Sequence, residues 1–149
     1  MKCGHNGLAN FLYEKTGLTR KLQISELGNR GDVRGVSFSA PPEALDFVGR
    51  LSDMYVASTA PGAIRGNHYH LLRREAIVPL PGTPWSLHWD ESESMPAEHR
   101  SFDGSSAILV LISPGASHAV RNDGPAPLWF VAISSETYDP SESVERKVV

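Results

Sequence analysis

The sequence contains a single cysteine, Cys3, among 149 residues, so no disulfide can form within the chain. It has no run of lysine and arginine, and its net charge of -3 argues against a nucleic-acid-binding surface. Nowhere do the roughly 18 apolar residues of a membrane-spanning helix follow one another. We therefore expect a cytoplasmic protein that acts on a small molecule and has neither nucleic acid nor membrane as its partner.

Helical periodicity is also scarce. Short apolar segments, separated by eleven prolines and thirteen glycines, are typical of a β-sandwich or barrel. We expect helix only around residues 8–15 and, as a single turn, at 42–47. The expected strands cover residues 21–27, 36–40, 54–59, 67–71, 75–80, 85–89, 107–112, 117–122 and 128–134.

These segments predict an all-β fold, a jelly-roll barrel in one domain that spans residues 21–140. Residues 1–20 form an N-terminal arm or short helix in this prediction, and residues 141–149 form a loosely attached polar tail. Segments 107–112 and 128–133 are apolar at every position, so both faces of these strands should be covered. A homodimer would cover the outer face, and packing of the first twenty residues is the alternative.

One stretch concentrates residues that can carry chemistry. His68 and His70 are two positions apart on a predicted strand, so both imidazoles point to the same face. A four-residue hairpin turn at 71–74 would place Glu75 opposite His70 on the neighbouring strand. His118 follows a Pro-Gly turn and is the first residue of a later strand that can point inward.

Three imidazoles and one carboxylate form a ligand set for a divalent transition metal. His68, His70, Glu75 and His118 are the candidate ligands. Zinc is our first choice, and iron, manganese and nickel are alternatives, whereas calcium and magnesium prefer oxygen ligands. The alternative interpretation is a metal-free barrel in which these histidines are hydrogen-bonded core groups or catalytic bases.

The spacing of these residues resembles the two sequence motifs of the cupin superfamily. The second motif departs from the family at Ser113, where proline is usual, and at Ala107, where glycine is usual. The resemblance covers roughly residues 53–134 and implies a double-stranded β-helix with its site inside. The residues that match the first motif are Gly62, His68, His70, Glu75 and Gly82, and those that match the second are Gly115, His118 and Asn122.

Three further segments resemble the nucleotide-sugar cupins. These proteins are the RmlC-like 4-keto-sugar 3,5-epimerases, the related keto-isomerases and the cupin domain of capsular polysaccharide reductase-epimerases. The resemblance implies an isomerase or epimerase of a keto-deoxysugar nucleotide in polysaccharide biosynthesis. The matching segments are Arg65-Gly-Asn-His-Tyr69, Asp32-Val-Arg-Gly35 and Tyr138-Asp-Pro140.

The same resemblance implies roles for individual residues. His68 would remove the proton next to the ketone, and Tyr138 would donate a proton. Without a metal, His68 would also need an orienting carboxylate, and Glu75 is the one that the strand pattern places nearby. Arg65, with Arg34 and Arg73, would bind the diphosphate of the substrate.

One nitrogen of His68 cannot both bind a metal and accept a proton, so His68 is either a metal ligand or the catalytic base through that nitrogen. The epimerases usually carry glutamine at the position of His70, and this difference favours metal binding. Two other functions remain open: a metal-dependent oxygenase or isomerase of another small molecule, and a non-enzymatic sugar-binding barrel.

Overall fold

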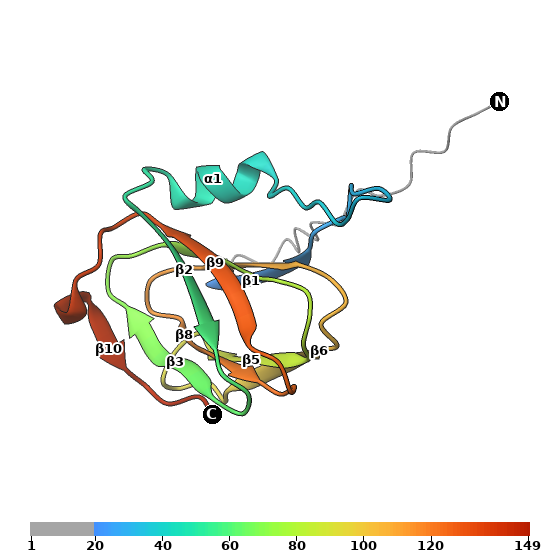
Figure 1. Ribbon diagram of the computed structural model, residues 1–149. Coiled ribbons are helices and arrows are strands. Elements are labelled where there is room, and N and C mark those ends of the chain that lie inside the picture. The colour runs from blue at the N-terminus through green and yellow to red at the C-terminus, as the bar shows by residue number, and fades with distance from the viewer. Residues whose placement is uncertain (1–19) are drawn as a thin grey trace.

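The structure, a computed structural model, describes residues 20–149, which form two antiparallel sheets of five strands that face each other (Figure 1). The expected arm and helix in residues 1–19 lie outside the described residues. The first sheet has the order β1-β7-β4-β9-β2, with β1 (Leu22–Glu26), β7 (Ile108–Ile112), β4 (Glu75–Pro79), β9 (Leu128–Ser134) and β2 (Asp53–Thr59). The second has the order β10-β3-β8-β5-β6, with β10 (Ser143–Glu145), β3 (Ile64–His70), β8 (Ser117–Asn122), β5 (Trp85–Asp90) and β6 (Glu98–Phe102).

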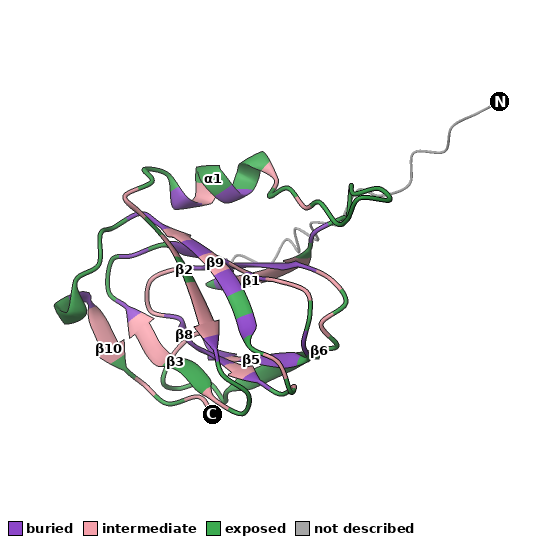
Figure 2. Cartoon of the chain, in the orientation of Figure 1, coloured by how far each residue is buried: buried purple, intermediate pink, exposed green. Residues whose placement is uncertain are grey.

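The main hydrophobic core consists of buried side chains from both sheets. Figure 2 shows the buried residues along the strands in purple. Trp85, Leu87 and Trp89 alternate along β5 and are all buried, as their spacing predicted. They pack against side chains from the first sheet, among them Ile77 and Phe130. This arrangement is the all-β jelly roll that the sequence predicted.

A second, smaller core lies on the outer face of the first sheet. Helix α1 (Pro42–Val48) begins with a proline in its first turn, where no intrahelical N–H partner is lost, and is followed by Gly49 at φ 75°. Ala44 and Val48 are buried in one cluster with Ala76 of β4 and with Leu109 and Leu111 of β7. The helix therefore packs on the outer face of the first sheet, where the sequence had indicated that apolar side chains need cover.

Two elements differ from the sequence prediction. Residues 36–40 form no strand, and Phe38 of this segment instead packs on the edge of the second core. Strand β6 was not predicted, because four of its five side chains are polar and lie on an exposed edge.

Residues 141–149 are polar, as predicted, but they are not loosely attached to the barrel. Short helix η1 (Pro140–Glu142) leads into β10, which pairs with β3 from Ser143 opposite His70 to Glu145 opposite His68. β3 would otherwise be an edge strand, and β10 satisfies its backbone groups. Two polar side chains of the segment, Glu142 and Arg146, also form hydrogen bonds to the barrel. Among residues 20–149, no helix has the length and apolar character needed to cross a membrane.

Candidate functional site

Three imidazoles gather on the inner face of the second sheet. His68 and His70 come from β3, and His118 of β8 lies directly opposite His68 in the strand ladder. Their ring centroids are 4.9 Å (His68 to His70), 5.0 Å (His68 to His118) and 5.8 Å (His70 to His118) apart. One ring nitrogen from each residue lies within 4.8 Å of the others.

Glu75 reaches this cluster by a different route from the one predicted. Residues 71–74 do not form a hairpin turn, because β3 and β4 belong to different sheets. The segment crosses between the sheets, so Glu75 faces the imidazoles across the interior of the barrel. Its Oε2 lies 3.7 Å from Nε2 of His70 and 3.6 Å from Nε2 of His118.

Hydrogen bonds on the far sides of two rings fix the direction of both Nε2 atoms. Nδ1 of His118 lies 3.2 Å from the Ala116 carbonyl oxygen, which can only accept, so Nδ1 carries the hydrogen. Nδ1 of His70 lies 2.9 Å from Oε2 of Glu142. Burial acts to raise the pKa of Glu142, but the backbone N–H groups of Arg73 and Leu72 help to lower it, so the group is a carboxylate. A carboxylate can only accept, so Nδ1 of His70 carries the hydrogen. When its ring is neutral, each Nε2 atom therefore presents a lone pair towards Glu75.

Electrostatics keep the histidine and carboxylate groups in defined charge states. Burial acts to raise the pKa of Glu75, but the rings of His118 and His70, which place positive charge beside the carboxylate when they are protonated, together outweigh it, so the pKa falls well below its usual range. Burial, with His118 and His70 nearby, lowers the pKa of His68 to about 4. At neutral pH Glu75 is an anion and His68 a neutral imidazole with a free lone pair.

Sequence reasoning missed Tyr55. Its hydroxyl donates a hydrogen bond of 2.8 Å to Oε1 of Glu75. Burial, and then the charge of Glu75, raise the pKa of Tyr55 far above its usual range, so the phenol stays protonated. The signal in the sequence is the alternation along β2, where Met54 and Val56 point outward and Tyr55 points inward.

A β-bulge brings Arg65 to the same face as the histidines. Arg65 pairs with Val120 and His68 pairs with His118, although three positions separate them on β3 and only two on β8. Asn67, at φ 59°, is the extra residue. Because Val120 and His118 both point inward, the bulge turns Arg65 and His68 inward as well.

The side chains become more accessible along β3 in the direction from His70 to Arg65. His70 is buried, His68 is partly buried and Arg65 is exposed, so the site opens to solvent at Arg65. Nε of Arg65 donates to the Ser58 carbonyl oxygen at 2.7 Å. Within residues 20–149 no hydrogen bond engages the ring of His68, and Glu75 contacts His70 and His118 rather than orienting His68 as predicted.

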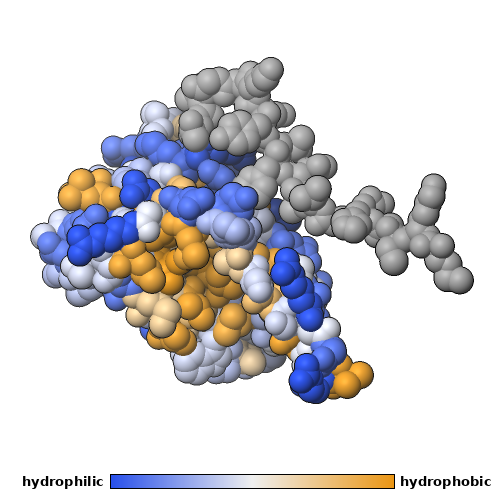
Figure 3. All heavy atoms as spheres, turned by 90° about the horizontal axis from the view of Figure 1, so that it is seen from above, coloured by the Kyte–Doolittle hydropathy of each residue, from blue (hydrophilic) through white to orange (hydrophobic). Residues whose placement is uncertain are grey.

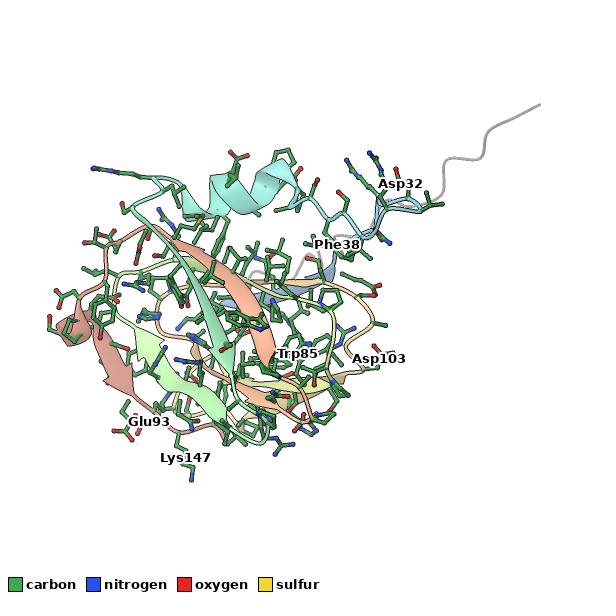
Figure 4. The ribbon with its side chains drawn as sticks, in the orientation of Figure 1. Asp32, Phe38, Trp85, Glu93, Asp103 and Lys147 are labelled. Atoms are coloured by element: carbon green, nitrogen blue, oxygen red, sulfur yellow. The ribbon has the colours of Figure 1, made fainter. Side chains whose placement is uncertain are left out.

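Three other predicted site residues do not join the cluster. The side chain of Arg34 is 87% exposed and paired with Asp32, in a loop that projects away from the barrel (Figure 4). Tyr138 is 76% exposed and makes no hydrogen bond or ring contact with the cluster. Arg73 is buried, donates to the Thr137 carbonyl oxygen at 3.0 Å and lies 3.8 Å from Glu142, so its charge is directed into the protein.

The donor set fits a transition metal. With bond lengths near 2.1 Å, two ligands of a tetrahedral ion lie about 3.4 Å apart. The distances of 3.6 and 3.7 Å from Glu75 to the two Nε2 atoms are close to this value and too long for direct hydrogen bonds. The spacing of Glu75 from His70 and His118 therefore fits such an ion, and the ring nitrogens of His68, His70 and His118 lie within 4.8 Å of one another.

Three solved structures illustrate the similarity of the fold. ChmJ, a 3′-monoepimerase from Streptomyces bikiniensis in complex with dTDP-quinovose, has a TM-score of 0.71 and 19% identity over 84% of this chain and 69% of its own. QdtA, a sugar 3,4-ketoisomerase from Thermoanaerobacterium thermosaccharolyticum in complex with TDP, has a TM-score of 0.67 and 13% identity over 87% and 90%. The capsular polysaccharide assembling protein CapF from Staphylococcus aureus has a TM-score of 0.60 and 19% identity, and covers 82% of this chain and 34% of its own.

No curated protein matched the sequence. A protein family described as the polysaccharide biosynthesis C-terminal domain matches residues 43–144, which is more than half of the chain and includes all four cluster residues. The chain thus belongs to the polysaccharide biosynthesis C-terminal domain family, and its fold is that of an RmlC-like cupin.

Proposed function

We propose that this protein is an epimerase or isomerase that acts on a keto-deoxysugar carried by a nucleoside diphosphate, in polysaccharide biosynthesis. The observation that carries the proposal is the bulge in β3, which puts a neutral imidazole, His68, and a guanidinium, Arg65, on one inner face at the open end of the site. Two structural neighbours support it, since ChmJ is a 3′-monoepimerase solved with dTDP-quinovose and QdtA is a sugar 3,4-ketoisomerase solved with TDP.

Epimerisation next to a ketone requires a base that removes the proton, stabilisation of the enolate oxygen, and a proton returned to the opposite face of the carbon. Binding a sugar linked to a nucleoside diphosphate additionally favours a cation near the diphosphate. His68 is the proposed base, because its lowered pKa leaves the imidazole neutral and its ring is the most accessible of the three. Arg65 is the proposed diphosphate ligand. Its Nε is engaged with Ser58, and the two terminal amino groups have no hydrogen-bond partner within residues 20–149, so both are available to phosphate oxygens.

We further propose that His70, His118 and Glu75 hold a divalent metal, with zinc as first choice. The direction of the two Nε2 atoms supports this assignment. It also resolves the conflict over His68, which keeps its lone pair for a proton when the other three residues are the ligands. A metal held there supplies a Lewis acid that polarises a carbonyl oxygen.

A homodimer is proposed for the assembly. The outer face of β2 and β9 carries adjacent large apolar side chains, Met54 at 64% exposure, Val56 at 58% and Trp129 at 52%. We call these three residues the β2/β9 patch. Viewed from the side of α1, this half of the molecule presents a continuous apolar area to solvent (Figure 3). A second copy related by a twofold axis would bury the same patch on both subunits.

Thermal melting with thymidine diphosphate tests the nucleotide part of the proposal. We expect a saturating concentration to raise the Tm of the wild type, since ligand at 100 times its Kd stabilises the fold by about 2.7 kcal/mol. Arg65→Ala should abolish the shift. Arg121→Ala is the matched control. Arg121 lies on the neighbouring strand β8, forms an ion pair with Asp123, and is opposite the exposed Ile64 in the strand register, so it is on the other face of the sheet from Arg65.

An unchanged Tm for the wild type, or a full shift in Arg65→Ala, would contradict the proposal. If the protein binds metal but does not respond to the nucleotide, the second candidate function is favoured, a metal-dependent cupin that acts on another small molecule. The three imidazoles are the observation in support of that alternative.

A further inference from the structure

We infer that the C-terminal segment 139–149, which we call the C-terminal strap, fixes the conformation of the strand that carries His68 and His70. Within it, Glu142 is a positioning residue for His70. The catalytic importance of this arrangement rests on the proposed function. The arrangement itself is a property of the protein that can be measured without metal or substrate.

Glu142 is held rigidly at the back of His70. The residue is 8% exposed, and its Oε1 accepts hydrogen bonds from the backbone N–H groups of Leu72 at 2.7 Å and Arg73 at 2.6 Å. The Leu71 N–H donates to the backbone oxygen of Glu142 at 3.0 Å. These bonds fix the carboxylate, so that only Oε2 remains for Nδ1 of His70, at 2.9 Å.

This contact selects the tautomer of His70. A carboxylate accepts hydrogen bonds and cannot donate one, so Nδ1 carries the hydrogen and Nε2 keeps the lone pair. The lone pair points towards Glu75 and the other imidazoles. The opposite tautomer would place an N–H there and could not bind a metal through that atom. Partners of this kind on the far ring nitrogen are what fix metal-binding histidines in general.

The other end of the strap holds the bulge before His68. The side-chain oxygen of Asn67 accepts from the N–H groups of Val148 at 2.9 Å and Val149 at 3.2 Å, and its Nδ2 donates to the Val149 oxygen at 3.2 Å. The Arg146 N–H donates to the Asn67 backbone oxygen at 2.9 Å.

The strap is thus attached to β3 on both sides of its two histidines, at the ring of His70 and at the residue before His68. Between these points β10 pairs along the same stretch of β3. One contiguous segment therefore fixes the conformation of the strand that carries the proposed base and one proposed ligand.

The substitution Glu142→Gln gives a sharp test. The amide oxygen should stay at the Oε1 position, where two N–H groups need an acceptor, which puts the amide NH₂ against Nδ1 of His70. An NH₂ group donates, so the tautomer of His70 should reverse while the size and bonding of the side chain are retained. Glu145→Gln, an exposed residue of β10 in the same strap, is the matched control.

Long-range ¹H–¹⁵N spectra of the metal-free full-length protein report which ring nitrogen carries the hydrogen. We expect hydrogen on Nδ1 of His70 in the wild type and in Glu145→Gln, and on Nε2 in Glu142→Gln. Hydrogen on Nε2 and none on Nδ1 in the wild type, or the same tautomer in the wild type and Glu142→Gln, would overturn the inference. Should Glu142→Gln not fold, the wild-type spectrum alone still decides.

The outcome is separable from that of the proposed function. A reversed tautomer together with no response to thymidine diphosphate would leave the positioning role intact and remove the nucleotide-sugar assignment. An unchanged tautomer together with a clear thermal response would do the opposite.

Discussion

At the scale of single residues, Glu75 is the group on which the others converge. Tyr55 from β2 donates to one of its oxygens, and Nε2 atoms from β3 and β8 lie near the other. The residue is 2% exposed and its lowered pKa keeps it charged. A buried anion of this kind is tolerated only while its partners remain, so each partner should contribute measurably to stability.

Tyr55→Phe removes one of these partners without changing the shape of the side chain. We expect the free energy of unfolding to fall by about 2 kcal/mol, because a hydrogen bond to a buried charged group is lost. Urea denaturation followed by circular dichroism measures the change. Tyr138→Phe should stay within about 0.5 kcal/mol of the wild type, since that side chain is 76% exposed. Equal losses in the two variants would show that the Tyr55 hydroxyl does not stabilise Glu75.

Metal content tests the proposed ligands. Protein purified without an affinity tag or added metal should contain about one divalent ion per chain, with zinc expected, as measured by elemental mass spectrometry. His118→Ala should lose most of it, because the site would keep too few ligands. His88→Ala should retain it, since His88 stacks on His99 on the outer face of the second sheet. Retention of metal in His118→Ala would mean that the ion is bound elsewhere.

The sequence predicted which histidines meet, but not what surrounds them. The two-residue spacing of His68 and His70 implies a shared face, and this depends only on strand geometry. Tyr55 and Glu142 could not be assigned to the site in this way. Their contacts with Glu75 and His70 join residues 20 and 72 positions apart, and no local pattern encodes such a meeting.

At the scale of elements, the bulge in β3 decides which side chains enter the site. Gly66 lies in it at φ 110°, a conformation that side chains disfavour. A Cβ on Gly66 would overlap the carbonyl oxygen of His118 and lie 2.8 Å from Cα of Ala119. Glycine is therefore required both for the backbone conformation and for the close approach of β3 to β8.

Gly66→Ala should consequently destabilise the fold by about 3 kcal/mol or more, as backbone strain and steric overlap add. Gly62→Ala is the comparison, because Gly62 also has a positive φ, 74°, but a Cβ there meets nothing within 4 Å. We expect that variant to lose only about 1 kcal/mol. Thermal and urea denaturation of the two variants measure the difference. Similar losses would show that the approach of the strands is not tight.

The sequence predicted well the strands that bury apolar side chains on one or both faces, because such burial leaves a pattern in the sequence. The predicted strands 117–122 and 128–134 match β8 and β9 at both ends, because turns with glycine or proline bound them. Strands β6 and β10 were missed for the opposite reason. They are short, mainly polar and lie at the two edges of the second sheet, where backbone pairing rather than side-chain burial holds a strand.

At the scale of the whole molecule, the site is assembled from distant parts of the chain. β2, β3, β4, β8 and the C-terminal strap each contribute at least one group, and these elements span both sheets. The site can therefore exist only when the two sheets have closed on each other. This also explains why the predicted hairpin between His70 and Glu75 was wrong although both residues reach the cluster.

The β2/β9 patch is an exposed apolar area on the outer face of the first sheet. Helix α1 covers part of the first sheet, yet Met54, Val56 and Trp129 remain more than half exposed. Exposed apolar areas of this kind usually mark an interaction surface. In a twofold dimer a single substitution acts twice, once on each subunit, and so weakens the contact strongly.

We therefore expect light scattering coupled to size-exclusion chromatography to give the wild type a mass near twice 16.2 kDa. Val56→Glu should shift the protein to the monomer, because a dimer formed through this face would bury two carboxylates without partners. Val33→Glu serves as the control. Val33 is fully exposed in the loop between Asp32 and Gly35, away from the sheet, so the same change there should leave the dimer intact. A monomeric wild type, or a Val56→Glu variant of unchanged mass, would exclude this face as the subunit interface.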